Sequence, residues 1–198
     1  MSLSAASESH VEEFWADKED VPGEKAMWLF VLGDFLIFSA YFVIYLVQRA
    51  WDKQGFLDAQ QHLDINLGII NTIVLITGSW FVAWAALAAR EGNAAKALSL
   101  VRLTMLSGFI FAALKVFEWS KEIKAGYTFT SNDFFGFYYV LTGIHLIHLV
   151  FGLAVLQIVV ARLKKGVADH RLVETGATYW HMVDLLWVLI LAFLYMLR

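Results

Sequence analysis

FFGFYYVLTGIHLIHLVFGLAVLQIVV, residues 134–160, decides the fold of this chain. The stretch contains no Asp, Glu, Lys or Arg, and about 20 apolar residues are enough for a helix to cross the hydrocarbon core of a bilayer. Four more runs have the same character: Ala26–Val47, Asn66–Ala89, Leu100–Phe117 and Ala177–Leu197. Because a backbone in lipid must satisfy its polar groups within its own segment, these runs predict helices. We therefore expect an all-α fold, an integral membrane bundle of five transmembrane helices.

The composition agrees with a membrane protein and excludes several other classes. Hydrophobic residues make up 60% of the chain, whereas a soluble domain has roughly 45–50%. A net charge of −3 leaves no broad basic surface, so nucleic acid is not expected as a partner. The absence of cysteine excludes disulfides, thiolate metal sites and cysteine nucleophiles. The sequence has no phosphate-binding glycine-rich loop, GxSxG or HExxH motif, so we expect no catalytic residues.

Charge divides the chain into two parts and orients it. Residues 1–25 are rich in Asp and Glu, and we interpret them as an acidic cytoplasmic arm before a membrane domain of residues 26–198. Lys and Arg gather on the cytoplasmic side of membrane proteins. The N-terminal side of the predicted bundle carries Lys18, Lys25, Arg90, Lys96, Arg102, Arg162, Lys164, Lys165 and Arg171. The opposite side carries only Arg49, Lys53, Lys121, Lys124 and Arg198. We therefore predict a cytoplasmic N-terminus and a C-terminus on the other side.

Asp34 is the first candidate functional residue, because ionisable side chains inside a membrane are costly. It lies in GDFLIF, near the middle of the first apolar run. It is either a proton site or a structural partner that locks its helix to a neighbour by hydrogen bonds. We expect it at a depth similar to that of His148 and Asp184, although similar depth alone does not establish contact.

His145 and His148 lie three residues apart, so they share a face of the fourth helix. Two roles are open for them: ligation of a metal or haem, and hydrogen bonding between helices. Of the six histidines in the chain, only these two and His181 fall within the predicted spans. Three intramembrane histidines and no cysteine make a small ligand set, so we favour the packing role and expect neither metal nor haem in this chain.

Two other pairs have the same spacing. His181 and Asp184 lie near the start of the fifth helix, where they either relay protons or, as we favour, stabilise packing. Lys115 and Glu118 lie at the outer end of the third helix, where we expect a local ion pair at the interface, with Lys115 reaching toward water. Glu174 precedes the fifth predicted helix, and we expect it to cap that helix or to lie at the level of the headgroups.

Several of these segments resemble subunit III of the haem–copper oxidases. FYYVLTGIHLIHLVFG (residues 137–152) is similar to that family's TGxHxxHVxxG segment, and YWHMVDLLWVL (residues 179–189) is similar to its YWHFVDVVW. LFVLGDFLIF (residues 29–38) resembles LFxxSExxFF, with Asp34 at the family's intramembrane carboxylate. NTIVLITGSWFVAWA (residues 71–85) resembles LNTLxLLxSSxTxxWA. Glu118 matches the Glu of the family's QxxEY segment, and Glu174 matches the Glu before YWH. The resemblance covers roughly residues 22–198.

Two departures from the family pattern are informative. Lys115 stands where the family usually has Gln, and the chain has five predicted helices where mitochondrial-type members have seven. A five-helix chain resembles quinol oxidase subunit III and the subunit III-like accessory protein of bacterial nitric oxide reductase. PGEKAMWLFVLGD (residues 22–34) together with FTSNDFFGFYYVLTGIHLIH (residues 129–148) is more similar to the accessory protein.

The resemblance implies a supporting subunit of a respiratory complex in the bacterial cytoplasmic (inner) membrane, with the C-terminus in the periplasm. Such a subunit holds no redox centre, packs against a haem-containing catalytic subunit and carries bound phospholipid. We therefore expect an accessory protein of nitric oxide reductase, acting in denitrification. The alternative is subunit III of a terminal cytochrome c or quinol oxidase. An alternative from another class is a stand-alone membrane transporter or channel, although neither an internal repeat nor a Gly/Pro-broken helix is visible.

Overall fold

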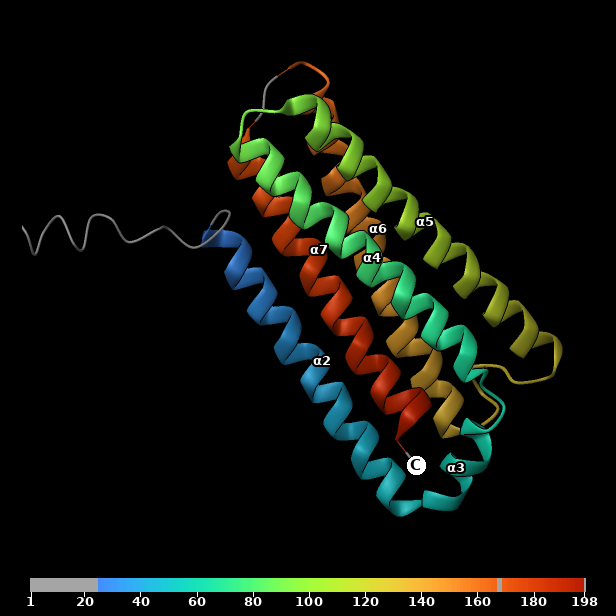
Figure 1. The fold of residues 1–198 in the computed structure, drawn as a ribbon. Helices are drawn as coiled ribbons and strands as arrows, with labels where there is room; N and C mark the ends of the chain where they lie inside the picture. The colour runs from blue at the N-terminus through green and yellow to red at the C-terminus, as the bar shows by residue number, and fades with distance from the viewer. Residues whose placement is uncertain (1–24, 167–168, 198) are drawn as a thin grey trace, which may run out of the picture.

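The computed structural model describes residues 25–166 and 169–197. Five long helices run alongside one another in this part of the chain (Figure 1). They are α2 (Lys25–Trp51), α4 (Ile65–Arg90), α5 (Ala94–Lys124), α6 (Asp133–Leu163) and α7 (His170–Leu191). Each is long and apolar enough to cross a bilayer, and the described residues contain no strand. The predicted all-α bundle of five transmembrane helices is confirmed, whereas the acidic arm lies outside the described residues apart from Lys25.

Four helices extend at both ends beyond the apolar runs that predicted them, whereas α7 begins before its run but ends at Leu191, short of Leu197. The third run was placed at Leu100–Phe117, but α5 begins at Ala94 and ends at Lys124. Hydrogen bonds of a helix backbone persist where the side chains become polar, so apolar runs mark only the part within the hydrocarbon. Side-chain caps then fix the starts: Asp64, Asn93, Asn132 and Asp169 each accept a hydrogen bond from a backbone N–H of the first turn.

Two shorter elements lie at the end of the bundle where α2 meets α4. Helix α3 (Lys53–Gln60) connects them and contacts α6 and α2 at this end of the bundle (Figure 1). Beyond Leu191 the chain continues as the π-helical turn η1 (Ala192–Met196), in which the Leu197 N–H donates to the Ala192 carbonyl at 2.9 Å. Such wide turns are rare in helices and occur often at functional sites.

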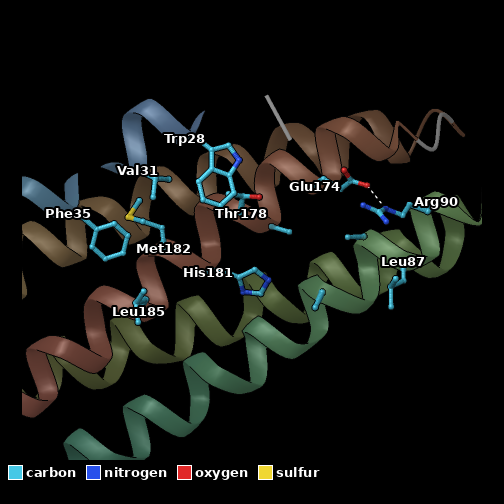
Figure 2. Close-up of a pocket in the computed structure, with 13 residues that line it drawn as sticks. Trp28, Val31, Phe35, Leu87, Arg90, Glu174, Thr178, His181, Met182 and Leu185 are labelled. Atoms are coloured by element: carbon cyan, nitrogen blue, oxygen red, sulfur yellow. Dashed lines mark hydrogen bonds and ion pairs between the residues drawn. The ribbon is translucent and has the colours of Figure 1, made fainter. Parts of the chain in front are cut away.

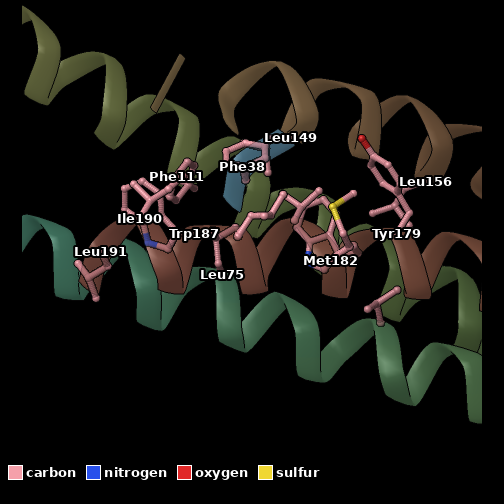
Figure 3. Packing of buried hydrophobic residues seen from close by; sticks show 14 of the residues in the cluster. Phe38, Leu75, Phe111, Leu149, Leu156, Tyr179, Met182, Trp187, Ile190 and Leu191 are labelled. Carbon is pink, nitrogen blue, oxygen red and sulfur yellow. The ribbon is translucent and has the colours of Figure 1, made fainter. Parts of the chain in front are cut away.

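Helix α7 forms the centre of the bundle, because it contacts α2, α4 and α6. Its large side chains fill the space between the other helices, as Figure 3 shows for Trp187, Ile190 and Leu191. Trp187 is fully buried, and its ring lies 4.7 Å from that of Phe111 on α5. The core is thus built outward from one helix, and groups on α7 are close to three neighbours at once.

Helices α4 and α5 approach each other through small residues. The Thr104 hydroxyl of α5 donates to the Gly78 carbonyl of α4 at 3.1 Å. A Cβ added at Gly78 would lie only 2.0 Å from the Ser107 hydroxyl oxygen. Small residues permit such close backbone contact, as is common between helices in membranes.

Candidate functional site

Asp34 and His148 meet between α2 and α6, as their predicted depths allowed. The His148 Nε2 lies 3.3 Å from an Asp34 carboxylate oxygen, which is ion-pair distance without hydrogen-bond geometry. The other ring nitrogen, Nδ1, lies 2.8 Å from the Ile144 carbonyl. A carbonyl only accepts, so Nδ1 carries the hydrogen, and Nε2 is protonated only if the ring is cationic. The contact between Nε2 and the carboxylate is therefore attractive only when one of the two groups carries a proton that the other can face.

His145, three residues before His148, is in a different environment. It is fully buried beside the rings of Phe111 and Trp187, at 5.4 and 5.3 Å between ring centroids. Neither of its ring nitrogens has a hydrogen-bond partner among the described residues. The interhelical hydrogen bond predicted for this histidine is therefore not formed, because its immediate neighbours are aromatic. The part of the chain that the structure describes contains no cluster of three or more His, Asp or Glu side chains suited to a metal ion.

Lys115 and Glu118 form the predicted ion pair, but its expected position at the interface was wrong. The Lys115 Nζ lies 3.0 Å from a Glu118 oxygen, and each side chain is only 1% exposed. Helix α5 continues nine residues beyond Lys115, so the lysine lies well inside the helix and cannot reach water at its end. Its side chain is instead enclosed by rings, with Tyr138, Trp187 and Tyr195 centroids 4.8–5.2 Å from Nζ.

Two tyrosines complete what we call the Lys115 cluster, consisting of Lys115, Glu118, Tyr138 and Tyr195. The Tyr138 and Tyr195 hydroxyls both donate to one Glu118 oxygen, at 3.0 and 2.5 Å. Lys115 donates to the other oxygen at 3.0 Å and to the Tyr195 hydroxyl at 2.7 Å. The donors and acceptors match when lysine is cationic and glutamate anionic, because each carboxylate oxygen then accepts and each hydroxyl donates once. A buried ion pair needs this full satisfaction to be tolerated.

His181 and Asp184 do not form the predicted pair. The His181 Nδ1 instead lies 2.5 Å from the Ser79 hydroxyl of α4. Asp184 is buried, and neither of its oxygens has a hydrogen-bond partner among the described residues, although Ser79 lies close to it. One turn of helix brings the two α7 side chains near each other but directs both toward α4. The structural role favoured for them is therefore a contact between α7 and α4.

A pocket of about 510 Å³ opens between α2, α4 and α7 (Figure 2). Its walls are mostly apolar, with Trp28, Val31 and Phe35 contributed by α2 and Leu87 by α4. His181 and Thr178 of α7 add polar atoms to the same space, as Figure 2 shows. We call it the Arg90 pocket, after the cation at one end. A long apolar space with a charged end suits an amphipathic molecule.

Glu174 holds that cation. It does not cap α7, as the sequence suggested, because α7 begins at His170 and its cap is Asp169. The Glu174 carboxylate accepts a hydrogen bond from the Arg90 Nε at 2.6 Å. The Glu174 side chain is 10% exposed and that of Arg90 is 53% exposed, so the carboxylate fixes an arginine that still faces outward.

Sequence patterns did not predict Arg90 or Tyr195 as site residues. Tyr195 lies 77 residues from Glu118 in the chain, and Arg90 lies 84 residues from Glu174. Spacing along one helix reveals partners three or four residues apart, but not partners on separate helices.

Comparison with known proteins gives a consistent result over the bundle. The family model for cytochrome c oxidase subunit III matches residues 23–198. A protein of Aeropyrum pernix named heme-copper oxidase subunit I+III is 31% identical over 201 residues, covering 94% of this chain and 24% of that protein. Proteins named cytochrome c oxidase subunit 3 are 30% identical in a Synechocystis species and 27% identical in a Bacillus species. These matches cover 85% and 86% of this chain and 73% and 83% of the relatives. This chain thus spans about a quarter of the first relative and most of the other two.

Proposed function

Because the chain belongs to the cytochrome c oxidase subunit III family, we propose that it is a non-catalytic membrane subunit of a haem–copper oxidase. The observation that carries this proposal is the family match, which includes all five transmembrane helices. Its role would be to support the assembly, stability or activity of the catalytic subunit. The buried ionisable groups described above are then elements of a rigid scaffold and of its contacts.

The partner we infer is the haem-containing catalytic subunit I. The Aeropyrum relative is named for subunits I and III together, and this chain aligns with only 24% of its length. Two subunits joined in one chain are held close together, which supports direct contact between the corresponding separate chains. Exposed apolar side chains on every long helix offer surfaces for such a partner and for membrane lipid.

The oxidase assignment replaces nitric oxide reductase as our main proposal. The sequence alone suggested the reductase accessory subgroup, but the relatives described above are named as oxidase subunits. Those names favour the alternative given by the sequence, subunit III of a terminal oxidase. The electron donor, cytochrome c or quinol, is a finer question that the same purification addresses.

Co-purification tests the partner and the reaction together. An affinity tag on this chain, mild detergent and native membranes should yield a complex with a haem absorption spectrum that consumes oxygen when given an electron donor. A complex that instead reduces nitric oxide would return the chain to the accessory subgroup. Recovery of the tagged chain in the membrane without any haem protein would contradict both and would favour the transporter alternative.

We also propose that the Arg90 pocket holds a phospholipid. The apolar walls between α2, α4 and α7 suit an acyl chain, and the outward-facing Arg90 suits a phosphate. Native mass spectrometry of the purified chain should detect bound phospholipid, and Arg90→Gln should reduce its retention. The matched control is Arg102→Gln, which changes an exposed arginine of a different helix, α5. Equal lipid retention in the two variants would contradict this location.

The orientation is a further proposal. The excess of Lys and Arg on the N-terminal side supports a cytoplasmic N-terminus and a periplasmic C-terminus in a bacterial inner membrane. Reporter fusions after Arg198 and in the connection between α6 and α7 should report opposite sides of the membrane. A cytoplasmic C-terminus would overturn the assignment.

A further inference from the structure

A second, more polar cavity lies at the end of the bundle near α3. It has a volume of about 380 Å³ and is lined by Leu57, Gln60, Gln61, Leu63, Ile65 and Tyr195. We call it the α3 recess. The outer face of α3 is polar and exposed, as the hydrogen bond between Gln54 and Asp58 illustrates. The recess therefore opens where the chain leaves the hydrocarbon.

Gln60 marks this recess as a binding site. Its side chain lines the cavity and the residue is only 7% exposed, yet its amide Nε2 has no hydrogen-bond partner among the described residues. An unpaired buried N–H group is costly, so an acceptor from outside the protein is expected beside it. The volume is ample for several water molecules, each of which occupies about 30 Å³ in the liquid.

Tyr195 belongs both to the recess and to the Lys115 cluster. Tyr195 is among the residues that line the recess, and its hydroxyl bonds to Glu118 and Lys115. Tyr138 makes a similar bond to Glu118 but does not line the recess. Tyr195 thus separates the polar cavity from the buried Lys115–Glu118 ion pair and contacts both.

The charged residues near Tyr195 favour the binding of protons over the binding of anions. Glu122, one turn beyond Glu118 on α5, is 3% exposed, and His62 and Asp64 lie near it in the connection between α3 and α4. Lys115 is the cation of the cluster, and the neighbouring Tyr138 of α6 is neutral when it donates to Glu118. Lys121, the residue before Glu122, is a second cation here, so three carboxylates stand against two lysines, and this excess of carboxylates favours water and hydronium over anions.

We propose that the α3 recess is a hydrated proton-exchange site, in which bound water exchanges protons with the Tyr195 hydroxyl and, through it, with the buried Lys115–Glu118 pair. The exchange is balanced: a hydronium in the recess gives a proton to the Tyr195 oxygen and becomes water, while the original Tyr195 hydroxyl proton passes to the Glu118 carboxylate oxygen that it already contacts. The reverse transfer returns the proton to water. Gln60 donates a hydrogen bond to this water and holds it in the recess.

Access to the recess is tested first. The chain has no native cysteine, so single cysteines can be introduced directly into the full protein in lipid nanodiscs. Gln60→Cys should react with a water-soluble methanethiosulfonate at least about tenfold faster than Leu75→Cys, a control that is 1% exposed in the core. Adding Gln61→Trp at the exposed rim should slow the Gln60→Cys reaction. Equal rates for Gln60→Cys and Leu75→Cys would overturn the proposal.

Proton contact is tested second, by infrared spectroscopy after transfer into deuterium oxide. The hydroxyl signals of Tyr195 and Tyr45 are assigned by difference from Tyr195→Phe and Tyr45→Phe. Tyr45 is fully buried and donates to the Phe193 carbonyl at 3.0 Å, and it does not line the recess. The Tyr195 hydroxyl should become deuterated before that of Tyr45, and Gln61→Trp should delay it. Simultaneous exchange, or exchange of Tyr195 unaffected by Gln61→Trp, would show a cavity without proton contact and would refute the proposal.

Discussion

Helices α7 and α2 both cross the membrane, but they are buried to different degrees. Of the most apolar stretch of each helix, 61% is buried in α7 and only 28% in α2. Helix α7 packs against α2, α4 and α6, whereas α2 lies at the edge, with large side chains such as Leu29, Leu32 and Leu36 exposed. The exposed face of α2 must therefore be covered by lipid or by another subunit, whereas α7 is covered mostly by other helices of this chain.

Two of the ionisable pairs between described residues follow the same division. The Lys115–Glu118 pair, beside α7, is satisfied by two tyrosines and enclosed by three rings. The Asp34–His148 pair, which joins α2 to α6, has a single contact at 3.3 Å and side chains that are 10% and 15% exposed. Breaking the first should affect folding, whereas breaking the second should affect how α2 and its neighbours associate.

The largest effect is expected when Lys115 is removed. Lys115→Met leaves the Glu118 carboxylate buried without its cation, which should lower the free energy of unfolding by about 3–5 kcal/mol. Unfolding in mixed micelles, followed by circular dichroism, measures this. Lys96→Met changes an exposed lysine of the same helix and should be nearly neutral. A loss no larger than that of Lys96→Met would show that the buried pair contributes little to stability.

A double variant separates the charge from the packing. Lys115→Met combined with Glu118→Gln removes both charges, and it should be more stable than Lys115→Met alone because no uncompensated charge stays buried.

Substitution of one glycine within the bundle and one on the edge helix α2 compares the packing of the two regions. Gly78→Ala would bring a Cβ to 2.0 Å from the Ser107 hydroxyl oxygen and should destabilise the α4–α5 contact by about 1–3 kcal/mol. Gly33→Ala on α2 meets nothing within 4 Å and should stabilise its helix by roughly 0.5–1 kcal/mol in the isolated chain. Unfolding in mixed micelles measures both. If Gly33→Ala nevertheless weakens recovery of the catalytic subunit, the partner packs at Gly33; equal effects of the two changes on stability would contradict the comparison.

Asp34 should show an intermediate effect, and chiefly on association. Asp34→Leu removes the contact with His148 and should weaken α2 docking by about 1–2 kcal/mol, the range for polar contacts between membrane helices. Asp34→Asn keeps a hydrogen-bonding group and should lose less. Retention of subunit I during purification in mild detergent measures the difference. Indistinguishable retention in the two variants would show that the Asp34–His148 contact does not contribute to association with subunit I.

The smallest effect is expected for one neutral hydrogen bond beside α7. The Trp187 Nε1 donates to the Thr72 hydroxyl at 3.0 Å, and Thr72→Val should cost about 0.6 kcal/mol, the average for such bonds in a membrane protein. Thr77→Val is the control, because the Thr77 hydroxyl donates to the Ile73 carbonyl of its own helix and makes no hydrogen bond to another helix among the described residues. Tryptophan fluorescence during unfolding should report a shift for Thr72→Val and little change for Thr77→Val.

The sequence predicted the helices well and their contacts unevenly. Five apolar runs are sufficient to locate five helices, because the requirement for internal hydrogen bonds in lipid leaves few alternatives. Trp180, Asp184 and Trp187 have the spacing of one helical face, and all three are buried. The contact between Asp34 and His148 was anticipated only as similar depth, since depth does not specify the rotation of either helix about its axis.

The failures have a common cause. His181 was paired with Asp184, but its partner is Ser79, on another helix. Lys115 was expected to reach water, but Tyr138, Trp187 and Tyr195 enclose it. In each case the sequence shows neighbours along one helix, whereas burial depends on residues that only tertiary packing brings together.

The π-helical turn η1 has a consequence for how related sequences should be aligned. A turn closed from Ala192 to Leu197 contains one residue more than an α-helical turn, so its side chains point in directions that an uninterrupted α-helix would not give them. Within this turn Phe193 stacks on Phe42 of α2 at 4.6 Å while Tyr195 reaches Glu118 of α5. A homologue one residue shorter here would span the membrane equally well, yet its tyrosine would need to stand one position earlier to make the same contact. In this segment a gap in the alignment therefore changes the chemistry more than most substitutions do.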